Sequence, residues 1–351
     1  AGIFDDQTAP VTASTAWETV RDPRPSLNEH IAWETRLGGS GNEKLVGALC
    51  HDGKIVVFGN TDSTDCDFTE RTGERGFIAV LSDSGRTERF LETDSIRTVT
   101  PHEQGYLLGI GGESPRLRLY DFDLGFVSET PLYGTMKEEI ADVVLTDEGY
   151  TVVTTVENTA TGSDAVRVIF YDRALNKRTN TLITRSAKLE YVGLFTYPTK
   201  TVVAINFISG IVDCLTFVEL KGGSPVFYDV NAEGGFTACD VIPYSDGYAA
   251  LIRSGGKADI LTVNANYTAA KRIYLSAAQC ASGMLLPAED ALYAYLHKTG
   301  DMSQLCKLDA NLNYVGSIAE ANTLSGAYDF FSQGAYTNIL CSAGSDTVIL
   351  S

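Results

Sequence analysis

Acidic side chains give this chain its densest set of groups that can bind a metal or transfer a proton. Asp62, Asp65 and Asp67 lie in one short segment, NTDSTDCDF, which begins at Asn60. Carboxylates at this density can ligate calcium, a hard cation that takes about six to eight oxygen ligands. The segment lacks the Asp-x-Asp-x-Asp-Gly register of the known calcium loop, and Asp side chains also cap the turns in which they lie. Two interpretations therefore stay open, a calcium site and a structural turn.

A second set of polar residues flanks strand-like runs further along the chain. Glu138 and Glu139 precede one run, Arg253 and Lys257 stand on either side of a Gly-Gly turn, and His297 ends a third run. Hydrolysis of a glycoside needs two carboxyl groups about 5 to 10 Å apart, so a glycoside hydrolase or lyase is one interpretation. Loops carry many Asp and Glu residues in any case, and the same groups equally suit noncatalytic binding.

Three aromatic residues complete the candidate set. They are Tyr191, Phe236 and Tyr328, which precede strand-like runs and are predicted to lie in connecting segments, where rings can stack on sugars or peptide side chains. The predicted ligand-binding residues are therefore Glu138, Glu139, Tyr191, Phe236, Arg253, Lys257, His297 and Tyr328. The sequence predicts no catalytic residue among them.

The sequence lacks the usual motifs of thiol, zinc, serine-nucleophile and phosphate-binding sites. The cysteines form no C-x-x-C pair, and neither H-E-x-x-H nor G-x-S-x-G occurs. No glycine-rich phosphate cradle follows a strand and opens a helix. The sequence therefore predicts no cofactor other than a structural calcium ion.

Net charge narrows the class of partner. Lys and Arg total 27 against 45 Asp and Glu, which gives a net charge of −18 and repulsion from phosphate backbones and anionic lipid surfaces. The chain also offers no run of about 18 apolar residues that could span a membrane. We therefore expect neither nucleic-acid binding nor membrane insertion. Because the chain begins at Ala1, we expect a mature or trimmed product from which any targeting peptide has been removed.

The elements that must position these residues repeat along the chain. An apolar run, a tight turn and a second apolar run begin at Val46, Val99, Val143 and Val241, and looser copies begin at Leu194, Leu285 and Phe331. The first copy reads VGALCHDGKIVVFG, in which Asp-Gly suits a two-residue hairpin turn. Hairpins that recur about every 43 to 52 residues are typical of a β-propeller. Every copy but the last extends to four strands, and an Asp or Asn opens the second turn by capping it, as in YDFDLGFV from Tyr120.

The last copy ends one strand short, while an unpaired strand-like segment precedes the first copy. If Ile31 to Leu37 completes the last blade, both edges are paired and the ring closes. The predicted fold is all-β, a seven-bladed propeller of four-stranded antiparallel blades, closed by the N-terminal strand at about 30–38. Residues 1–28 are predicted to form a tether or arm, and residues 29–351 a single propeller domain.

Residues 33–85 add a resemblance to a known family. The segments WETRLGGSGNEKLVGALCHDGKIVVFGNTDSTDCDF and GFIAVLSDSG resemble one repeat of secreted bacterial β-propeller proteins, with the pattern W-x4-G-G-S-G-N/D, then D-G-G-Y-I-V-x-G-x-T-x-S-x-D-x-D-F, then L-D-x-x-G. The chain departs from this pattern at Gly53-Lys54 and at Ser82. The resemblance implies an exported propeller. It assigns no catalytic residues to this chain.

Together these observations favour a noncatalytic binding module, extracellular or on the cell surface and tethered there through its N-terminal arm. In a propeller, the candidate residues would lie in the loops around one mouth of the central channel. There they would contact a peptide, glycan or protein ligand. Two alternatives stay open. One is an enzyme that acts on an extracellular polysaccharide, and the other is a structural spacer in a surface assembly.

Overall fold

The computed structural model consists of strands and connecting turns. It describes residues 34–69, 73–82, 84–132, 137–157, 164–211, 213–221, 224–230, 232, 234–276, 280–287, 291–298, 302–321, 326–333, 336–343 and 346–350. No helix occurs among these residues. The predicted tether, residues 1–28, lies outside the described residues.

The chain forms two compact units. The first comprises Ala1–Ile96 and Ala278–Ser351, and the second comprises Arg97–Ala277. The strands of the first unit are β1 (Glu34–Leu37), β2 (Glu43–His51), β3 (Lys54–Thr61), β4 (Arg75–Leu81), β5 (Thr87–Thr93), β22 (Cys280–Pro287), β23 (Ala291–Lys298), β24 (Met302–Asp309), β25 (Tyr314–Ala321), β26 (Gly326–Gln333), β27 (Tyr336–Ala343) and β28 (Asp346–Leu350). Their sheets have the orders β2-β3-β4-β5, β22-β23-β24-β25 and β1-β28-β27-β26.

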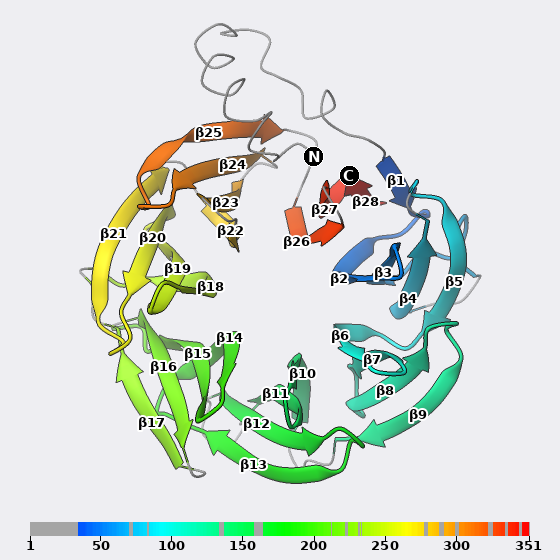
Figure 1. The fold of residues 1–351 in the computed structure, drawn as a ribbon, viewed down its shortest axis with the longest axis horizontal. Coiled ribbons are helices and arrows are strands. Elements are labelled where there is room, and N and C mark those ends of the chain that lie inside the picture. The colour runs from blue at the N-terminus through cyan, green and yellow to red at the C-terminus, as the bar shows by residue number, and fades with distance from the viewer. Residues whose placement is uncertain are drawn as a thin grey trace, which may run out of the picture. The chain divides into compact units, whose positions relative to one another are not determined.

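The second unit is built in the same way. Its strands are β6 (Ile96–His102), β7 (Gly105–Ile110), β8 (Arg116–Asp121), β9 (Phe126–Pro131), β10 (Lys137–Thr146), β11 (Gly149–Glu157), β12 (Ala165–Asp172), β13 (Lys177–Ile183), β14 (Lys188–Tyr197), β15 (Lys200–Ile208), β16 (Asp213–Lys221), β17 (Ser224–Asp229), β18 (Thr237–Tyr244), β19 (Gly247–Ser254), β20 (Lys257–Val263) and β21 (Ala269–Ser276). Each sheet contains four consecutive strands, β6–β9, β10–β13, β14–β17 and β18–β21, which lie side by side in Figure 1.

The N-terminal strand joins the last sheet. Strand β1 pairs antiparallel with β28, with Glu34 opposite Leu350 and Leu37 opposite Thr347. The pairing that the sequence predicted is therefore present over Glu34–Leu37. The remainder of the predicted strand, residues 30–33, lies outside the described residues.

The first strand of most sheets carries a β-bulge at the same place. The pairing register skips one residue in β2, β10, β14, β18, β22 and β26, namely Val46, Ala141, Val192, Cys239, Ala281 and Tyr328. A bulge bends the strand and increases its local twist. This shared register places residues of different sheets at equivalent positions, which the sequence alone did not show.

The middle strands form the core of each sheet. Every residue of β4 is buried, and in the first sheet Ile55, Val57, Phe77 and Leu81 pack with Phe68 from the long loop after β3. The outer strand β5 is exposed or half-buried throughout. Continuous apolar runs such as IVVF therefore mark strands that are covered on both faces.

The turn before the outer strand is capped as the sequence predicted. Asp121 Oδ1 accepts hydrogen bonds from the backbone N–H groups of Asp123 and Gly125, at 2.9 and 2.7 Å. Leu124 in this turn has a φ of 66°, an unusual conformation for a residue with a branched side chain, and its side chain is buried. The same turn recurs with Leu175, Tyr267 and Leu312 at the positive-φ position.

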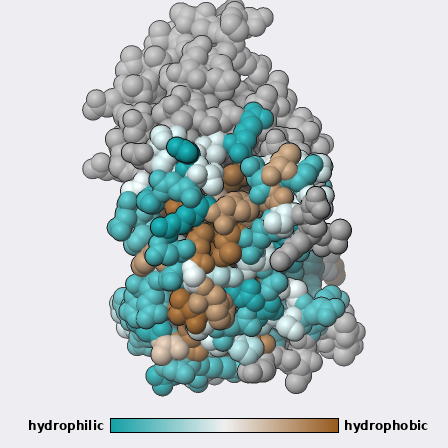
Figure 2. Space-filling model, turned by 90° about the vertical axis from the view of Figure 1, so that its right-hand side faces the viewer, coloured by the Kyte–Doolittle hydropathy of each residue, from teal (hydrophilic) through white to brown (hydrophobic). Residues whose placement is uncertain are grey.

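Apolar side chains also reach the surface. On the outer strand β9, Phe126 is 62 % exposed and Val127 is 42 % exposed. The side of the molecule drawn in Figure 2 shows hydrophobic residues gathered between hydrophilic ones. An edge strand with exposed apolar side chains is a surface that can receive another chain.

Candidate functional site

The three aspartates of the loop after β3 hold a neighbouring segment of backbone. The N–H groups of Gly38, Ser40 and Asn42, which connect β1 to β2, donate to the carboxylates of Asp67, Asp65 and Asp62 at 3.1, 2.7 and 2.5 Å. We call this arrangement the aspartate clasp. Among the described residues, no group of three or more His, Cys, Asp or Glu side chains could hold a metal ion. The geometry supports the structural-turn interpretation, and a calcium ion at these aspartates stays an untested prediction.

Gly39 and Gly41 of the clasp lie so close to neighbouring atoms that a side chain would not fit at either position. A Cβ atom on Gly41 would lie 2.2 Å from Asp62 Oδ1, and one on Gly39 would lie 2.6 Å from Ser63 Cβ. Real Cβ atoms do not approach other atoms this closely. The Gly-Gly-Ser-Gly-Asn segment and the Asp-rich loop therefore fit each other because small residues face carboxylates.

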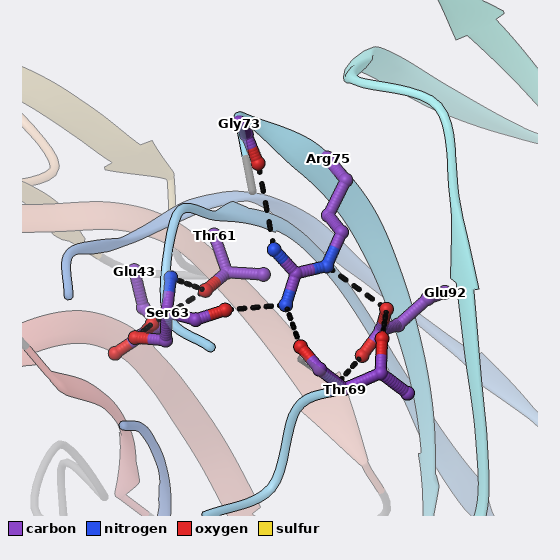
Figure 3. Close-up of polar contacts among 7 residues, drawn as sticks. All are labelled: Glu43, Thr61, Ser63, Thr69, Gly73, Arg75 and Glu92. Atoms are coloured by element: carbon purple, nitrogen blue, oxygen red, sulfur yellow. Dashed lines mark hydrogen bonds and ion pairs between the residues drawn. The ribbon is translucent and has the colours of Figure 1, made fainter. Parts of the chain in front are cut away.

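A buried polar network supports the same loop (Figure 3). The hydroxyl groups of Thr61 and Ser63 both donate to Glu43 Oε1, at 2.6 and 2.5 Å. Arg75 forms an ion pair with Glu92 at 2.9 Å and also donates to the carbonyl oxygen atoms of Ser63, Thr69 and Gly73. Figure 3 shows the guanidinium group lying between these partners. All of these groups are engaged with one another, so the network orders the loop.

An open cleft lies in the second unit, between sheets β6–β9 and β10–β13. Its volume is about 970 Å³, within the range of pockets that take small molecules or side chains of a partner. The lining residues are Gly112, Glu113, Ser114, Pro115, Pro131, Leu132, Lys137, Glu138, Glu139, Thr155, Val156, Glu157 and Asp164. The sequence-predicted Glu138 and Glu139 are therefore brought together with groups that sequence reasoning missed.

The carboxylates of the cleft differ in burial and in partners. Glu138 is only 6 % exposed, and it accepts a hydrogen bond from Thr154 Oγ1 at 2.9 Å and lies 2.7 Å from Arg167. Glu139 is exposed and forms an ion pair with Arg97 at 2.8 Å. Successive residues of a strand point to opposite faces, which explains this difference. The cleft therefore has one buried and one accessible carboxylate at its edge.

Two of the three predicted aromatic residues lie elsewhere than the sequence suggested. Tyr191 lies within β14 and not in a connection, and Tyr328 is the bulge residue of β26. Phe236 does lie in the connection before β18, but it is 2 % exposed and packs in the apolar core of its unit with Val230 and Tyr248. The Phe236 ring is therefore part of this core and is not available for stacking on a ligand.

The remaining predicted residues do not line the cleft. Arg253 and Lys257 are exposed at the hairpin that joins β19 to β20 in the second unit. His297 lies on β23 of the first unit, and its Nδ1 atom is buried without a hydrogen-bond partner among the described residues. Among the predicted ligand-binding residues whose side chains the structure describes, only Glu138 and Glu139 line the cleft.

Tyr191 instead links the first strands of neighbouring sheets. Its hydroxyl group donates to Asp142 Oδ2 at 2.5 Å, and Thr98 Oγ1 lies 3.5 Å from Asp142 Oδ1. Burial raises the pKa of Asp142, and burial together with the nearby Asp142 carboxyl raises the pKa of Tyr191 well above its usual value. This contact therefore joins β6, β10 and β14.

Comparison with known proteins addresses the fold. No family model and no curated protein sequence matches the chain. Among solved structures, it is similar to the Dos1 propeller, with 13 % identity, a TM-score of 0.54 and coverage of 92 % of this chain and 94 % of that one. It is similar to BBS1N in complex with ARL6DN, with 10 % identity, a TM-score of 0.60 and coverage of 91 % and 95 %. It is also similar to the β-propeller domain of the Trilobed protease from Pyrococcus furiosus, with 9 % identity, a TM-score of 0.54 and coverage of 90 % of this chain and 95 % of that one.

The chain has a β-propeller fold. Its four-stranded antiparallel sheets and these similarities together establish the fold, and at such low identity they establish nothing about activity. The described part of the chain contains no helix long and apolar enough to cross a lipid bilayer.

Proposed function

We propose that this propeller is a noncatalytic binding module that acts outside the cell or at its surface. The ligand, a peptide, a glycan or part of a partner protein, enters the cleft between sheets β6–β9 and β10–β13. The observation that carries this proposal is the cleft of about 970 Å³ edged by Glu138 and Glu139. The location outside the cell rests on the resemblance of residues 33–85 to secreted propeller repeats.

The geometry favours binding over hydrolysis of a glycoside. A glycosidase needs two carboxyl groups that face one bond from opposite sides. Glu138 and Glu139 are consecutive in β10, so they point to opposite faces of the strand, and each contacts a different arginine. This arrangement suits charge recognition at the edge of a cleft better than paired acid and base catalysis.

The proposal includes a closed ring of seven blades as the scaffold. Its support is the set of four-stranded sheets and the pairing of β1 with β28. Deleting residues 30–38 would leave β28 without this partner, so we expect loss of the folded state. Deleting residues 1–25 is expected to leave thermal unfolding unchanged. Equal melting temperatures for the two deletions would contradict the closed ring.

A thermal-shift screen against oligosaccharides and peptides tests the binding function, because a ligand that binds the native state raises the melting temperature. Thr155→Trp places a large side chain in the cleft, while Thr179→Trp adds the same ring on the exposed strand β13. We expect the shift to vanish in the first variant and to persist in the second. No shift with any compound, or equal shifts in both variants, would contradict the proposal.

A further inference from the structure

Two histidine residues occupy equivalent positions in two hairpins of the chain. His51 is the last residue of β2 and His102 is the last residue of β6, so each stands directly before the turn to the next strand. The side chain of His51 is 36 % exposed and lies 3.5 Å from the carboxylate of Asp52. His102 is only 8 % exposed. The same position of a hairpin therefore holds one partly exposed and one buried imidazole ring.

The ring of His102 is held by its own turn. The backbone N–H of Gln104 donates a hydrogen bond of 3.1 Å to His102 Nδ1. An imidazole nitrogen accepts a hydrogen bond only while it carries no proton, so the neutral ring has its proton on Nε2. A proton on Nδ1 would set two N–H groups against each other and break this bond. The conformation of the β6–β7 turn is therefore linked to the protonation state of one ring.

The same ring also packs against the next sheet. It stacks on the ring of Tyr150 in β11, with the ring centroids 5.8 Å apart and 11° between the ring planes. Tyr150 is 2 % exposed and belongs to an apolar core to which sheets β6–β9 and β10–β13 both contribute. His102 therefore fastens the β6–β7 turn to sheet β10–β13. We call the hydrogen bond from Gln104 and the stack on Tyr150 together the histidine latch.

A cavity of about 340 Å³ lies beside the latch, and residues 102–104 form one of its walls. Strands β8 and β9 contribute Leu119, Val127 and Ser128 to the lining, and these side chains carry no charge. The turn between β12 and β13 contributes Arg173. Among the described residues that line the cavity, Glu103 and Arg173 are therefore the permanently charged groups near the ring.

The other titratable groups around the latch lie in the turn between β10 and β11 and on the stacked tyrosine. Arg173 donates to two backbone carbonyl oxygens of the β10–β11 turn, at 3.3 Å each. That turn also carries the carboxylates of Asp147 and Glu148. Burial raises the pKa of Tyr150, so its phenol group is neutral whenever the imidazole titrates.

Burial decides how readily the latched ring takes up a proton. It lowers the pKa of His102 from its usual value of 6.5, and the positive charge of Arg173 acts in the same direction. The negative charge of Glu103 and a hydrogen bond with the backbone of Arg173 act in the opposite direction, but burial outweighs them. The latched ring therefore holds a proton less tightly than the same ring in water.

We propose that His102 is a proton-operated latch, which holds the β6–β7 turn on sheet β10–β13 at neutral pH and releases it on mild acidification. The ring takes up one proton from solvent on Nδ1, and the N–H of Gln104 then turns to water. Because the released ring binds protons more tightly than the latched ring, each proton taken up favours release. The latch is closed above about pH 6.5 and weakens as the pH falls below this value. Release opens the adjoining cavity on the side of the turn.

The first test needs no variant. Imidazole carbon chemical shifts of the full chain are followed between about pH 8 and pH 5, together with the hydrogen exchange of the Gln104 amide, corrected for its intrinsic rate at each pH. We expect His102 to titrate below pH 6.5. We also expect the protection of the Gln104 amide to fall about tenfold between pH 7 and pH 5. Titration of His102 at or above pH 6.5, or constant protection of the amide, would overturn the latch.

Matched variants show whether the acid response comes from this ring. His102→Gln keeps an acceptor for the turn and cannot take up a proton in this range, so the protection of the Gln104 amide should be the same at pH 7 and pH 5. His51→Gln removes the ring from the equivalent hairpin position and should leave the tenfold fall unchanged. The same fall in His102→Gln as in the parent chain would overturn the proposal. If His102→Gln does not fold, the titration of the parent chain decides.

Discussion

The hydroxyl group of Tyr191 donates a hydrogen bond of 2.5 Å to Asp142, and this contact joins strand β14 to strand β10. Tyr191→Phe removes the donor and leaves a carboxyl group whose burial already disfavours its ionised form. We expect a loss of about 1 to 3 kcal/mol in the free energy of unfolding, measured with urea. Tyr274→Phe, on the exposed ring of β21, is the control and should change stability by less than about 0.5 kcal/mol. Equal effects of the two variants would show that the hydroxyl contact does not stabilise the unit.

The side-chain amide of Asn206 makes two hydrogen bonds with the backbone of Ala238, a bridge from β15 to β18 that yields a second prediction. Asn206→Ala leaves the backbone N–H and carbonyl groups of Ala238 without these two partners in a buried place. The expected loss is about 2 to 4 kcal/mol in the free energy of unfolding. Asn180→Ala, on the exposed strand β13, serves as the matched control. A loss no larger than that of Asn180→Ala would argue against the bridge.

The aspartate clasp predicts a requirement for glycine at position 41. Gly41→Ala would place Cβ against Asp62 Oδ1, so the connector must shift and the hydrogen bonds to Asp62 and Asp65 must weaken. We expect a loss of about 1 to 3 kcal/mol on denaturant unfolding. In Gly235→Ala the new Cβ would meet its nearest neighbour at 3.7 Å, an ordinary contact. Gly235→Ala is therefore expected to be tolerated, and equal stability of both variants would contradict the clasp.

Glu219 predicts a dependence of stability on pH. Burial opposes its ionisation, but hydrogen bonds from Lys200, Tyr267 and Lys221 outweigh burial and lower its pKa from 4.5 to about 2. A carboxyl group whose pKa is lower in the folded state stabilises the fold above its unfolded pKa. That stabilisation is lost as the pH falls from about 4.5 towards 2. Urea midpoints across this range should fall less steeply in Glu219→Gln than in the parent chain. A parallel fall in both would contradict the prediction, and Glu148→Gln is the control.

Much of the fold could be predicted from the sequence because strands and turns leave local patterns. Apolar runs such as IVVF, the Asp-Gly turn at Asp52 and the capped turn at Asp121 are local, and the structure contains the hairpins and turns that they predict. The partner of β1 could be predicted because the last sheet was one strand short. Local patterns report backbone conformation, and these features depend on little else.

The site was harder to predict because it is a cleft between two sheets, and its shape depends on how both sheets pack. Glu138 and Glu139 were found from their charge alone, but the cleft that they line is formed by residues from two sheets that are distant in sequence. The bulges were also invisible in sequence, so Tyr191 was assigned to a connection rather than to β14. Phe236 was predicted at the surface because nothing local shows that a ring in a short connection is buried.

The pairing of β1 with β28 has a consequence for how the chain is made. Leu37 and Thr347 are partners about 310 residues apart in sequence, so closing that loop costs about 5 kcal/mol of chain entropy. During synthesis, β1 leaves the ribosome before the other strands of the structure. It can form this pairing only after β28 has also been synthesised. A chain that ends before β28 therefore leaves β1 without this partner, and an unpaired strand edge favours aggregation.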